Sequence, residues 1–265
     1  MFVEKSSHFH SALEIGGPFC WRLLPGIMKY GCGYGSRLIL ITTWLVAMAI
    51  GTACAGPSYS LAHSPTPYVR DDPTEYYLYL PSNYSPDREW PVFVGIHGFG
   101  GSGLGCLSLW QAYADQEGFV LVCPSLADEN GGWYQDQGDA VLSRILQQVA
   151  QECHVQKRIF LAGFSAGATF VQGFALAHPD LVAAVAVLSA GNYYEPAPQA
   201  RGVIFLVVIG DHDNPIAIRG AERFTQALKQ DGFSTELHVL PGVGHTVSAE
   251  AKELTISLLD RLYGN

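Results

Sequence analysis

The chain has 265 residues, a length that usually forms one domain and can bury a substantial core. Its formal net charge at pH 7 is −9, with 15 basic and 24 acidic residues. Nucleic acids and anionic membrane surfaces bind to basic faces, so this composition argues against a nucleic-acid partner and against membrane binding through a basic patch.

The first 55 residues differ from the rest and are expected to be a leader. A thirteen-residue apolar stretch at 38–50 follows a basic segment and precedes Ala53-Cys54-Ala55, which is the pattern of a secretory signal peptide cut after Ala55. The run is short for a membrane span, which needs about 20 apolar residues. Because residues 1–27 only lengthen the basic segment, we expect translation to begin at Met28.

The leader predicts a secreted or periplasmic protein. Two alternatives stay open: an uncleaved N-terminal anchor, and a lipid attached to Cys54. Without one of these, no stable membrane partner is expected. Three of the six cysteines would leave with the leader, and an odd number would remain, namely Cys106, Cys123 and Cys153. Cys123 lies in an apolar run and is expected in the core, while the pairing of the three is not determined.

After a linker rich in Pro and Ser, placed at 56–73, strand-like and helix-like segments alternate through the catalytic domain expected at 74–265. Most strand-like segments are continuous aliphatic runs, as in strands buried on both faces. Strands are predicted at 76–80, 92–96, 119–123, 159–162, 184–188, 203–209 and 236–240, and helices at 107–116, 138–152, 168–177, 217–230 and 248–263. This order predicts an α/β protein with a mostly parallel sheet, helices on both faces and ligands beyond the carboxyl ends of the strands.

A candidate nucleophile lies between the strand at 159–162 and the helix at 168–177. The sequence Gly163-Phe164-Ser165-Ala166-Gly167 has the G-x-S-x-G spacing of a sharp strand-to-helix turn, which exposes a serine hydroxyl. A serine needs such exposure, a general base and nearby N–H groups to act as a nucleophile. We therefore predict that Ser165 is catalytic.

The base and its orienting acid are expected in loops after the last two strands. His245 follows the final strand in a glycine-rich loop, and the order serine, acid, histidine is that of α/β-hydrolases. Two carboxylates, Asp211 and Asp213, follow the strand at 203–209. We favour Asp213 as the acid and expect Asp211 to cap its own turn. A metal site at 211–213 is disfavoured because adjacent residues rarely converge on one ion.

Two backbone N–H groups would stabilise the oxyanion. One belongs to Ala166, and the other is expected from Phe99 in the loop His97-Gly98-Phe99-Gly100-Gly101. This loop lacks the Gly-Lys-Ser/Thr of a P-loop and the spacing of a dinucleotide-binding loop. His97 is expected to support the loop, and no cofactor is implied because the triad needs none.

These motifs, over 74–263, resemble the α/β-hydrolase superfamily. The segment Tyr77-Leu78-Tyr79-Leu80-Pro81, followed by Trp90-Pro91-Val92, is similar to secreted esterases of the polyhydroxybutyrate-depolymerase and feruloyl-esterase type. The resemblance implies hydrolysis of a carboxylic ester through an acyl-enzyme on Ser165. Dienelactone hydrolases look similar in outline but use cysteine where this chain has Ser165, and this departure argues against them.

The gaps from Ser165 to Asp213 and from Asp213 to His245 leave no room for a large lid domain. We therefore predict an open cleft, suited to an extended, bulky or polymeric acyl group. The expected partner is a small-molecule or polymeric ester of aryl, cinnamoyl or polyester type. Substrate contacts are expected from the loop aromatics Trp133, Tyr134 and Tyr193, with Phe99 and Tyr194 also at the border.

Asp136 and Asp139 are expected to cap a helix rather than to react. A peptidase or acyltransferase with the same triad, and an inactive binding module, remain as alternatives.

Overall fold

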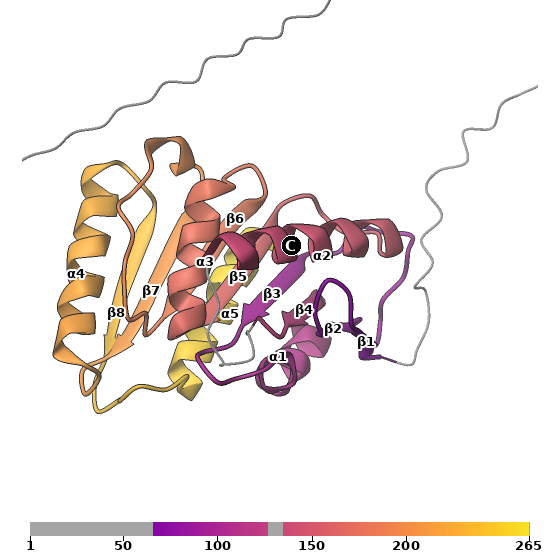
Figure 1. Cartoon of the computed structure of the whole chain (residues 1–265), viewed down its shortest axis with the longest axis horizontal. Helices are drawn as coiled ribbons and strands as arrows, with labels where there is room; N and C mark the ends of the chain where they lie inside the picture. Colours follow the sequence, from indigo (N-terminus) through magenta and orange to yellow (C-terminus); the bar gives the residue numbers. More distant parts are fainter. Residues whose placement is uncertain (1–65, 127–134, 265) are drawn as a thin grey trace, which may run out of the picture. The chain divides into compact units, whose positions relative to one another are not determined.

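An eight-stranded sheet forms the centre of the computed structural model, which describes residues 66–126 and 135–264 (Figure 1). Its strand order is β1-β2-β4-β3-β5-β6-β7-β8. The strands are β1 (Tyr68–Arg70), β2 (Tyr76–Tyr79), β3 (Val92–Ile96), β4 (Val120–Pro124), β5 (Ile159–Phe164), β6 (Val182–Leu188), β7 (Ile204–Gly210) and β8 (Thr235–Leu240). The first two pairs, β1 with β2 and β2 with β4, are antiparallel, and all pairs from β4 to β8 are parallel.

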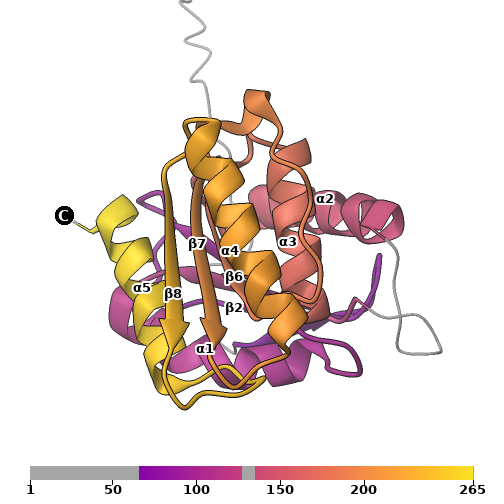
Figure 2. The ribbon, with the colours of Figure 1, turned by 90° about the vertical axis from the view of Figure 1, so that its left-hand side faces the viewer.

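Five α-helices cover the two faces of this sheet. They are α1 (Gly103–Glu117), α2 (Gln135–Glu152), α3 (Ala166–Ala177), α4 (Pro215–Gln230) and α5 (Ala249–Tyr263). The apolar sides of α1 and α5 belong to one core cluster, and those of α2, α3 and α4 belong to the other. Figure 2 shows α4 and α5 on opposite sides of β7 and β8. The predicted mostly parallel sheet with helices on both faces is confirmed, and the described connections between Ser165 and His245 contain no lid domain.

Capping side chains explain where several helices begin. Ser102 Oγ accepts a hydrogen bond from the N–H of Gly105, so α1 begins four residues before the predicted start. Asn214 accepts from the N–H of Ile216 and places Pro215 at the first position of α4, where a proline fits. Both helices therefore start directly after loops that carry candidate site residues.

The predicted linker at 56–73 is wrong in its last part. Tyr68–Arg70 form β1, which pairs with β2 along the edge of the sheet. The pattern was missed because three residues are too short for periodicity to show. The expected leader at 1–55, with its start at Met28 and its apolar run at 38–50, lies outside the described residues. Within the described ranges, no helix is long and apolar enough to cross a membrane.

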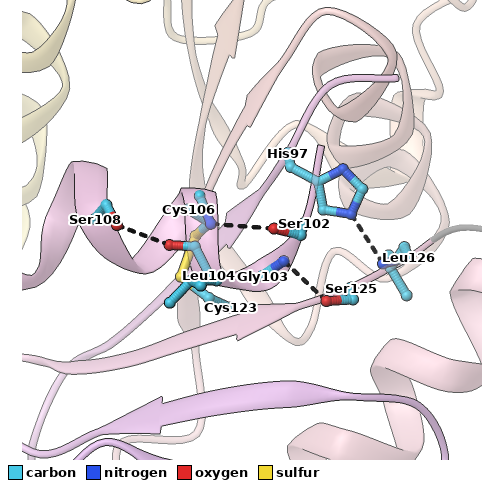
Figure 3. The surroundings of a disulfide bond; sticks show 10 residues. His97, Ser102, Gly103, Leu104, Cys106, Ser108, Cys123, Ser125 and Leu126 are labelled. Atoms are coloured by element: carbon cyan, nitrogen blue, oxygen red, sulfur yellow. Dashed lines mark hydrogen bonds between the residues drawn. A yellow bond between two sulfur atoms is a disulfide. The ribbon is translucent and has the colours of Figure 1, made fainter. Parts of the chain in front are cut away.

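A disulfide joins Cys106 on α1 to Cys123 on β4 (Figure 3). Both residues are buried, so the core position expected for Cys123 is confirmed. Gly103 strengthens the same junction, because its N–H donates to Ser125 Oγ over 2.9 Å. Cys153 is free and buried, and burial raises the pKa of its thiol to about 12. The start of α1 is thus fixed to β4 by a covalent bond and a hydrogen bond.

Candidate active site

Ser165 sits in a strained turn between β5 and α3. Its φ is 54° and its ψ is −114°, a conformation that non-glycine residues rarely adopt. A Cβ on Gly163 would overlap the carbonyl of Gly167, and a Cβ on Gly167 would overlap the carbonyls of Ile96 and His97. The two glycines of the motif therefore let β5, α3 and the end of β3 meet at one point, which holds the serine at the carboxyl edge of the sheet.

The structure brings Ser165, His245 and Asp213 together. His245 Nε2 lies 2.9 Å from Ser165 Oγ, and His245 Nδ1 lies 3.1 and 3.0 Å from the two carboxylate oxygens of Asp213. The side chain of Asp213 is only 3% exposed, whereas that of His245 is 49% exposed. A buried carboxylate at Nδ1 favours the tautomer in which Nε2 is free to accept the serine proton.

The loops that carry the acid and the histidine are fitted closely to each other. A Cβ on Gly210, the last residue of β7, would overlap the carbonyl of Val243. The sequence predicted that Asp211 caps its own turn, and this prediction is wrong. Its carboxylate instead accepts a hydrogen bond of 2.7 Å from the N–H of Gly242. The nearest partner lies in the next loop because parallel strands β7 and β8 end side by side. Sequence spacing gave no signal for this contact.

The predicted oxyanion donors belong to two segments that meet at Ser165. Ala166 is the first residue of α3, where a backbone N–H has no partner within the helix. Phe99 follows Gly98, and a Cβ on Gly98 would lie 3.2 Å from the Cβ of Ser165. The backbone of this loop therefore approaches the nucleophile closely. The side chain of Phe99 is 69% exposed and points away from the core.

His97 supports the oxyanion loop through both ring nitrogens. Nδ1 lies 2.7 Å from the carbonyl of Gly98, which can only accept, and Nε2 accepts from the N–H of Leu126 over 3.0 Å. Figure 3 shows the contact with Leu126. These partners require a neutral ring with its proton on Nδ1. Burial lowers the pKa of His97, in agreement with that state.

Two cavities adjoin one another beside the histidine. The first, of about 450 Å³, is lined by His245, Asp213, Asn214 and Ile216 among others. The second, of about 410 Å³, shares Gly191 and Ile216 with it and includes Tyr193. Together they extend from His245 along the start of α4.

Tyr193 is half-buried in the second of these cavities, and Tyr194 is exposed beside it. The ring of Tyr193 packs 5.2 Å from that of Phe224. Burial, and then the charge of Asp213, raise the pKa of its hydroxyl. The other two expected substrate contacts, Trp133 and Tyr134, lie outside the described residues.

One expected helix cap has another role. The carboxylate of Asp139 lies 2.8 Å from Nε2 of His178, so it joins α2 to the end of α3 and does not cap a helix. The capping prediction failed because α2 begins at Gln135 and places Asp139 inside the helix. The side chain of Asp136 is outside the described part. Among the described residues, no group of three or more His, Cys, Asp or Glu side chains could hold a metal ion.

Comparison with known proteins gives one family match. The model of the dienelactone hydrolase family matches residues 75–258. The expectation that Ser165 excludes this family is therefore wrong, because the match spans most of the domain in a chain with serine at this position. A solved structure from Klebsiella pneumoniae, named as a putative dienelactone hydrolase, matches with a TM-score of 0.59 at 18% identity, over 71% of this chain and 91% of that one.

Curated relatives match at moderate identity. Feruloyl esterase B of Thermothelomyces thermophilus is 31% identical over 134 residues, which are 45% of this chain and 45% of that protein. A bifunctional acetylxylan esterase/xylanase of Neocallimastix patriciarum is 29% identical over 153 residues, which are 56% of this chain and 22% of that protein. The chain thus spans half or less of the length of these relatives. A thermophilic esterase of Thermogutta terrifontis has a TM-score of 0.59 at 17% identity and covers 75% of this chain and 93% of that one.

Proposed function

Because the chain belongs to the dienelactone hydrolase family of α/β-hydrolases, we propose that it is a serine esterase that hydrolyses carboxylic esters through an acyl-enzyme on Ser165. The observation that carries the proposal is the continuous hydrogen-bonded contact from Ser165 Oγ through His245 to the buried Asp213. The relatives named as feruloyl and acetylxylan esterases support an ester as the substrate.

In the first half-reaction, Ser165 Oγ attacks the ester carbonyl carbon while His245 Nε2 takes the hydroxyl proton. The carbonyl oxygen becomes an oxyanion, which the N–H groups of Phe99 and Ala166 stabilise. When this intermediate collapses, the bond to the alkoxy oxygen breaks, and His245 returns the proton to the departing alcohol.

In the second half-reaction, a water molecule attacks the acyl-enzyme while His245 takes one of its protons. Collapse of this intermediate breaks the bond to Ser165 Oγ, which regains a proton from His245, and the carboxylic acid leaves. Throughout, Asp213 holds the ring and stabilises its charged form. The two half-reactions together consume one ester and one water molecule.

Hydrolysis of p-nitrophenyl acetate and p-nitrophenyl hexanoate by the purified full-length protein tests this proposal. We expect Ser165→Ala to lower kcat/KM by at least about 10³-fold, because the remaining oxyanion hole cannot replace the nucleophile. Equal activity of the variant and the wild type would refute a mechanism through Ser165. Activity on amide or acyl-transfer substrates in place of esters would favour the peptidase or acyltransferase alternative, and no activity on any of them would favour the binding module.

We further propose that the protein is exported and that its leader is cut after Ala55. The proposal is supported by the basic segment, the apolar run at 38–50 and the small residues before the cut. N-terminal sequencing of the exported protein tests it, with Gly56 expected as the first residue. An intact N-terminus on the mature chain, or a lipid on Cys54, would refute the cut after Ala55.

A further inference from the structure

A third cavity, of about 320 Å³, lies on the oxyanion-loop side of the site and has no role in the mechanism above. One of its walls is a single stripe of α1 and its cap, made of residues three and four positions apart, as helix geometry requires for one face. These residues are Ser102, Gly105, Cys106, Leu109 and Trp110. Gly98 and Phe164 form the wall nearest the catalytic serine.

Gly98 and Phe164 are direct neighbours of the reacting groups. Gly98 precedes the oxyanion donor Phe99, and a Cβ on Gly98 would lie 3.1 Å from the ring of Phe164 and 3.2 Å from the Cβ of Ser165. Phe164 precedes the nucleophile, and its ring centroid lies 4.9 Å from that of His245. The cavity therefore begins beside the position of the ester carbonyl carbon.

The chemistry of the proposed reaction assigns the two sides of the site. His245 must protonate the departing oxygen, so the alcohol part of the ester lies toward the cavity that His245 lines. The acyl chain stays bonded to the same carbonyl carbon and extends from it in another direction. Of the three cavities described above, the one walled by Gly98 and Phe164 adjoins this carbon without being lined by His245.

We infer that this cavity is the acyl pocket and that it selects apolar acyl groups larger than acetyl, such as an alkyl chain of several carbons or a phenyl ring. The inference rests on the esterase function proposed above. An apolar cavity of about 150 Å³ can hold a benzene molecule, so a cavity of about 320 Å³ has room for such a group. An acetyl group would leave most of it unfilled.

The walls of the pocket also favour an acyl group without polar substituents. Leu109, Trp110, Phe164 and Val247 present hydrocarbon surface. Two of the polar side chains among the lining residues already have backbone partners: both nitrogens of His97 are hydrogen-bonded, and Ser102 Oγ accepts from the N–H of Gly105. A phenolic hydroxyl buried here would exchange its water partners for walls that are mostly hydrocarbon, which weakens binding.

The pocket is preformed because α1 is fixed at its start. Cys106, in the middle of the stripe, is bonded to Cys123 on β4, and Gly103 donates to Ser125 Oγ (Figure 3). A wall held in this way keeps its position when the substrate is absent, so binding energy need not be used to order it.

Substitution of Gly105 tests the assignment. Gly105 lines the cavity, and a Cβ at this position meets only Ser102 Oγ, at 3.9 Å, so the space beside it is open for a larger side chain such as that of Gly105→Leu. In the full-length protein, wild type should cleave p-nitrophenyl hexanoate with a higher kcat/KM than the acetate. Gly105→Leu should lower the hexanoate-to-acetate ratio of kcat/KM at least tenfold. Ser108→Leu places the same side chain on α1 outside the cavity and should change the ratio less than twofold.

A second variant decides the matter if Gly105→Leu fails to fold. Leu109→Ala shortens a wall residue and should raise the ratio for p-nitrophenyl decanoate against hexanoate at least threefold. Ratios within twofold of wild type in the folded variants, or a wild-type preference for acetate, would overturn the acyl pocket. If instead the wild type and Ser165→Ala have equal rates on every ester, the esterase proposal itself fails, so the two failures are distinguishable.

Discussion

The carboxylate of Asp211 accepts a hydrogen bond from the N–H of Gly242, 31 positions later in the chain. Asp211 follows β7, and Gly242 lies three residues before His245 in the loop that follows β8. Gly242 has a φ of 71°, which glycine adopts without strain. The two loops of the candidate triad are thus joined by a side chain that does not touch the reacting atoms.

We expect Asp211→Ala to lower kcat about three- to tenfold with little change in KM, because the loop of His245 becomes less well ordered. A hydrogen bond of this kind contributes about 1 kcal/mol to stability, which corresponds to this range. Asp211→Asn keeps an acceptor oxygen and should retain most of the activity. Steady-state kinetics on p-nitrophenyl hexanoate and thermal unfolding of all three proteins would check this expectation.

Asp213→Ala should be far more damaging than Asp211→Ala. Loss of the carboxylate at His245 Nδ1 removes the group that orients the ring and stabilises its charged form, which costs about 10³- to 10⁴-fold in kcat. The same kinetic measurement decides between the two carboxylates. A larger loss in Asp211→Ala than in Asp213→Ala would contradict the assignment of the acid.

The glycines of the serine turn should be intolerant of any side chain. Gly167→Ala would press a methyl group against the carbonyls of Ile96 and His97, and we expect a loss of about 3 kcal/mol or more in the free energy of unfolding. Gly202→Ala is the matched control, because nothing lies within 4 Å of its added Cβ. Urea unfolding should find the free energy of unfolding of the control within about 0.5 kcal/mol of wild type. Equal stability of the two variants would contradict the prediction, because the backbone of the serine turn would then have room for the methyl group.

Stability should depend on pH through His97. Burial lowers the pKa of this histidine below its ordinary value of 6.5, so the unfolded chain binds a proton that the folded chain does not. The free energy of unfolding should therefore fall as the pH drops below 6.5. His97→Gln removes this group, so the free energy of unfolding should fall less steeply between pH 6.5 and 5.5. The difference in slope should correspond to less than one bound proton. Parallel curves for the two proteins would argue against a neutral His97 in the folded state.

The cysteines predict a distinct labelling pattern. Cys153 is buried, and its raised pKa keeps the thiol protonated, so iodoacetamide should not modify it in the native protein. Denaturation without reductant should expose Cys153, while Cys106 and Cys123 should react only after reduction. Peptide mapping of the full-length chain resolves the three sites. Native labelling of Cys153, or labelling of Cys106 before reduction, would be inconsistent with this arrangement.

Much of the fold could be predicted from the sequence because the strands are continuous apolar runs. All seven predicted strands and all five predicted helices are present. The edge strand β1 was not predicted, because its three residues pair with β2 through backbone groups that leave no pattern in the side chains. The start of α1 was placed too late because its first residues include two glycines, and the cap at Ser102 was not recognised.

Local motifs were sufficient to predict which residues of the site lie together, while their catalytic roles stay predictions. The G-x-S-x-G turn and the order of Ser165, Asp213 and His245 were sufficient to anticipate the contacts between them. Contacts between separate loops, such as Asp211 with Gly242, depend on which strands are neighbours in the sheet. The disulfide and the pocket beside Phe164 depend on the packing of α1 against β4, and neither follows from spacing alone.

The position of His245 after β8 links hydrolysis to the completion of folding. Parallel strands pair only when the chain between them crosses over, so we expect β8 to join the sheet after β7. A folding intermediate that lacks β8 would hold Ser165 in its turn without a base beside it. Such an intermediate would be inert toward esters, and recovery of activity during refolding would therefore report the docking of the last strand rather than the collapse of the core.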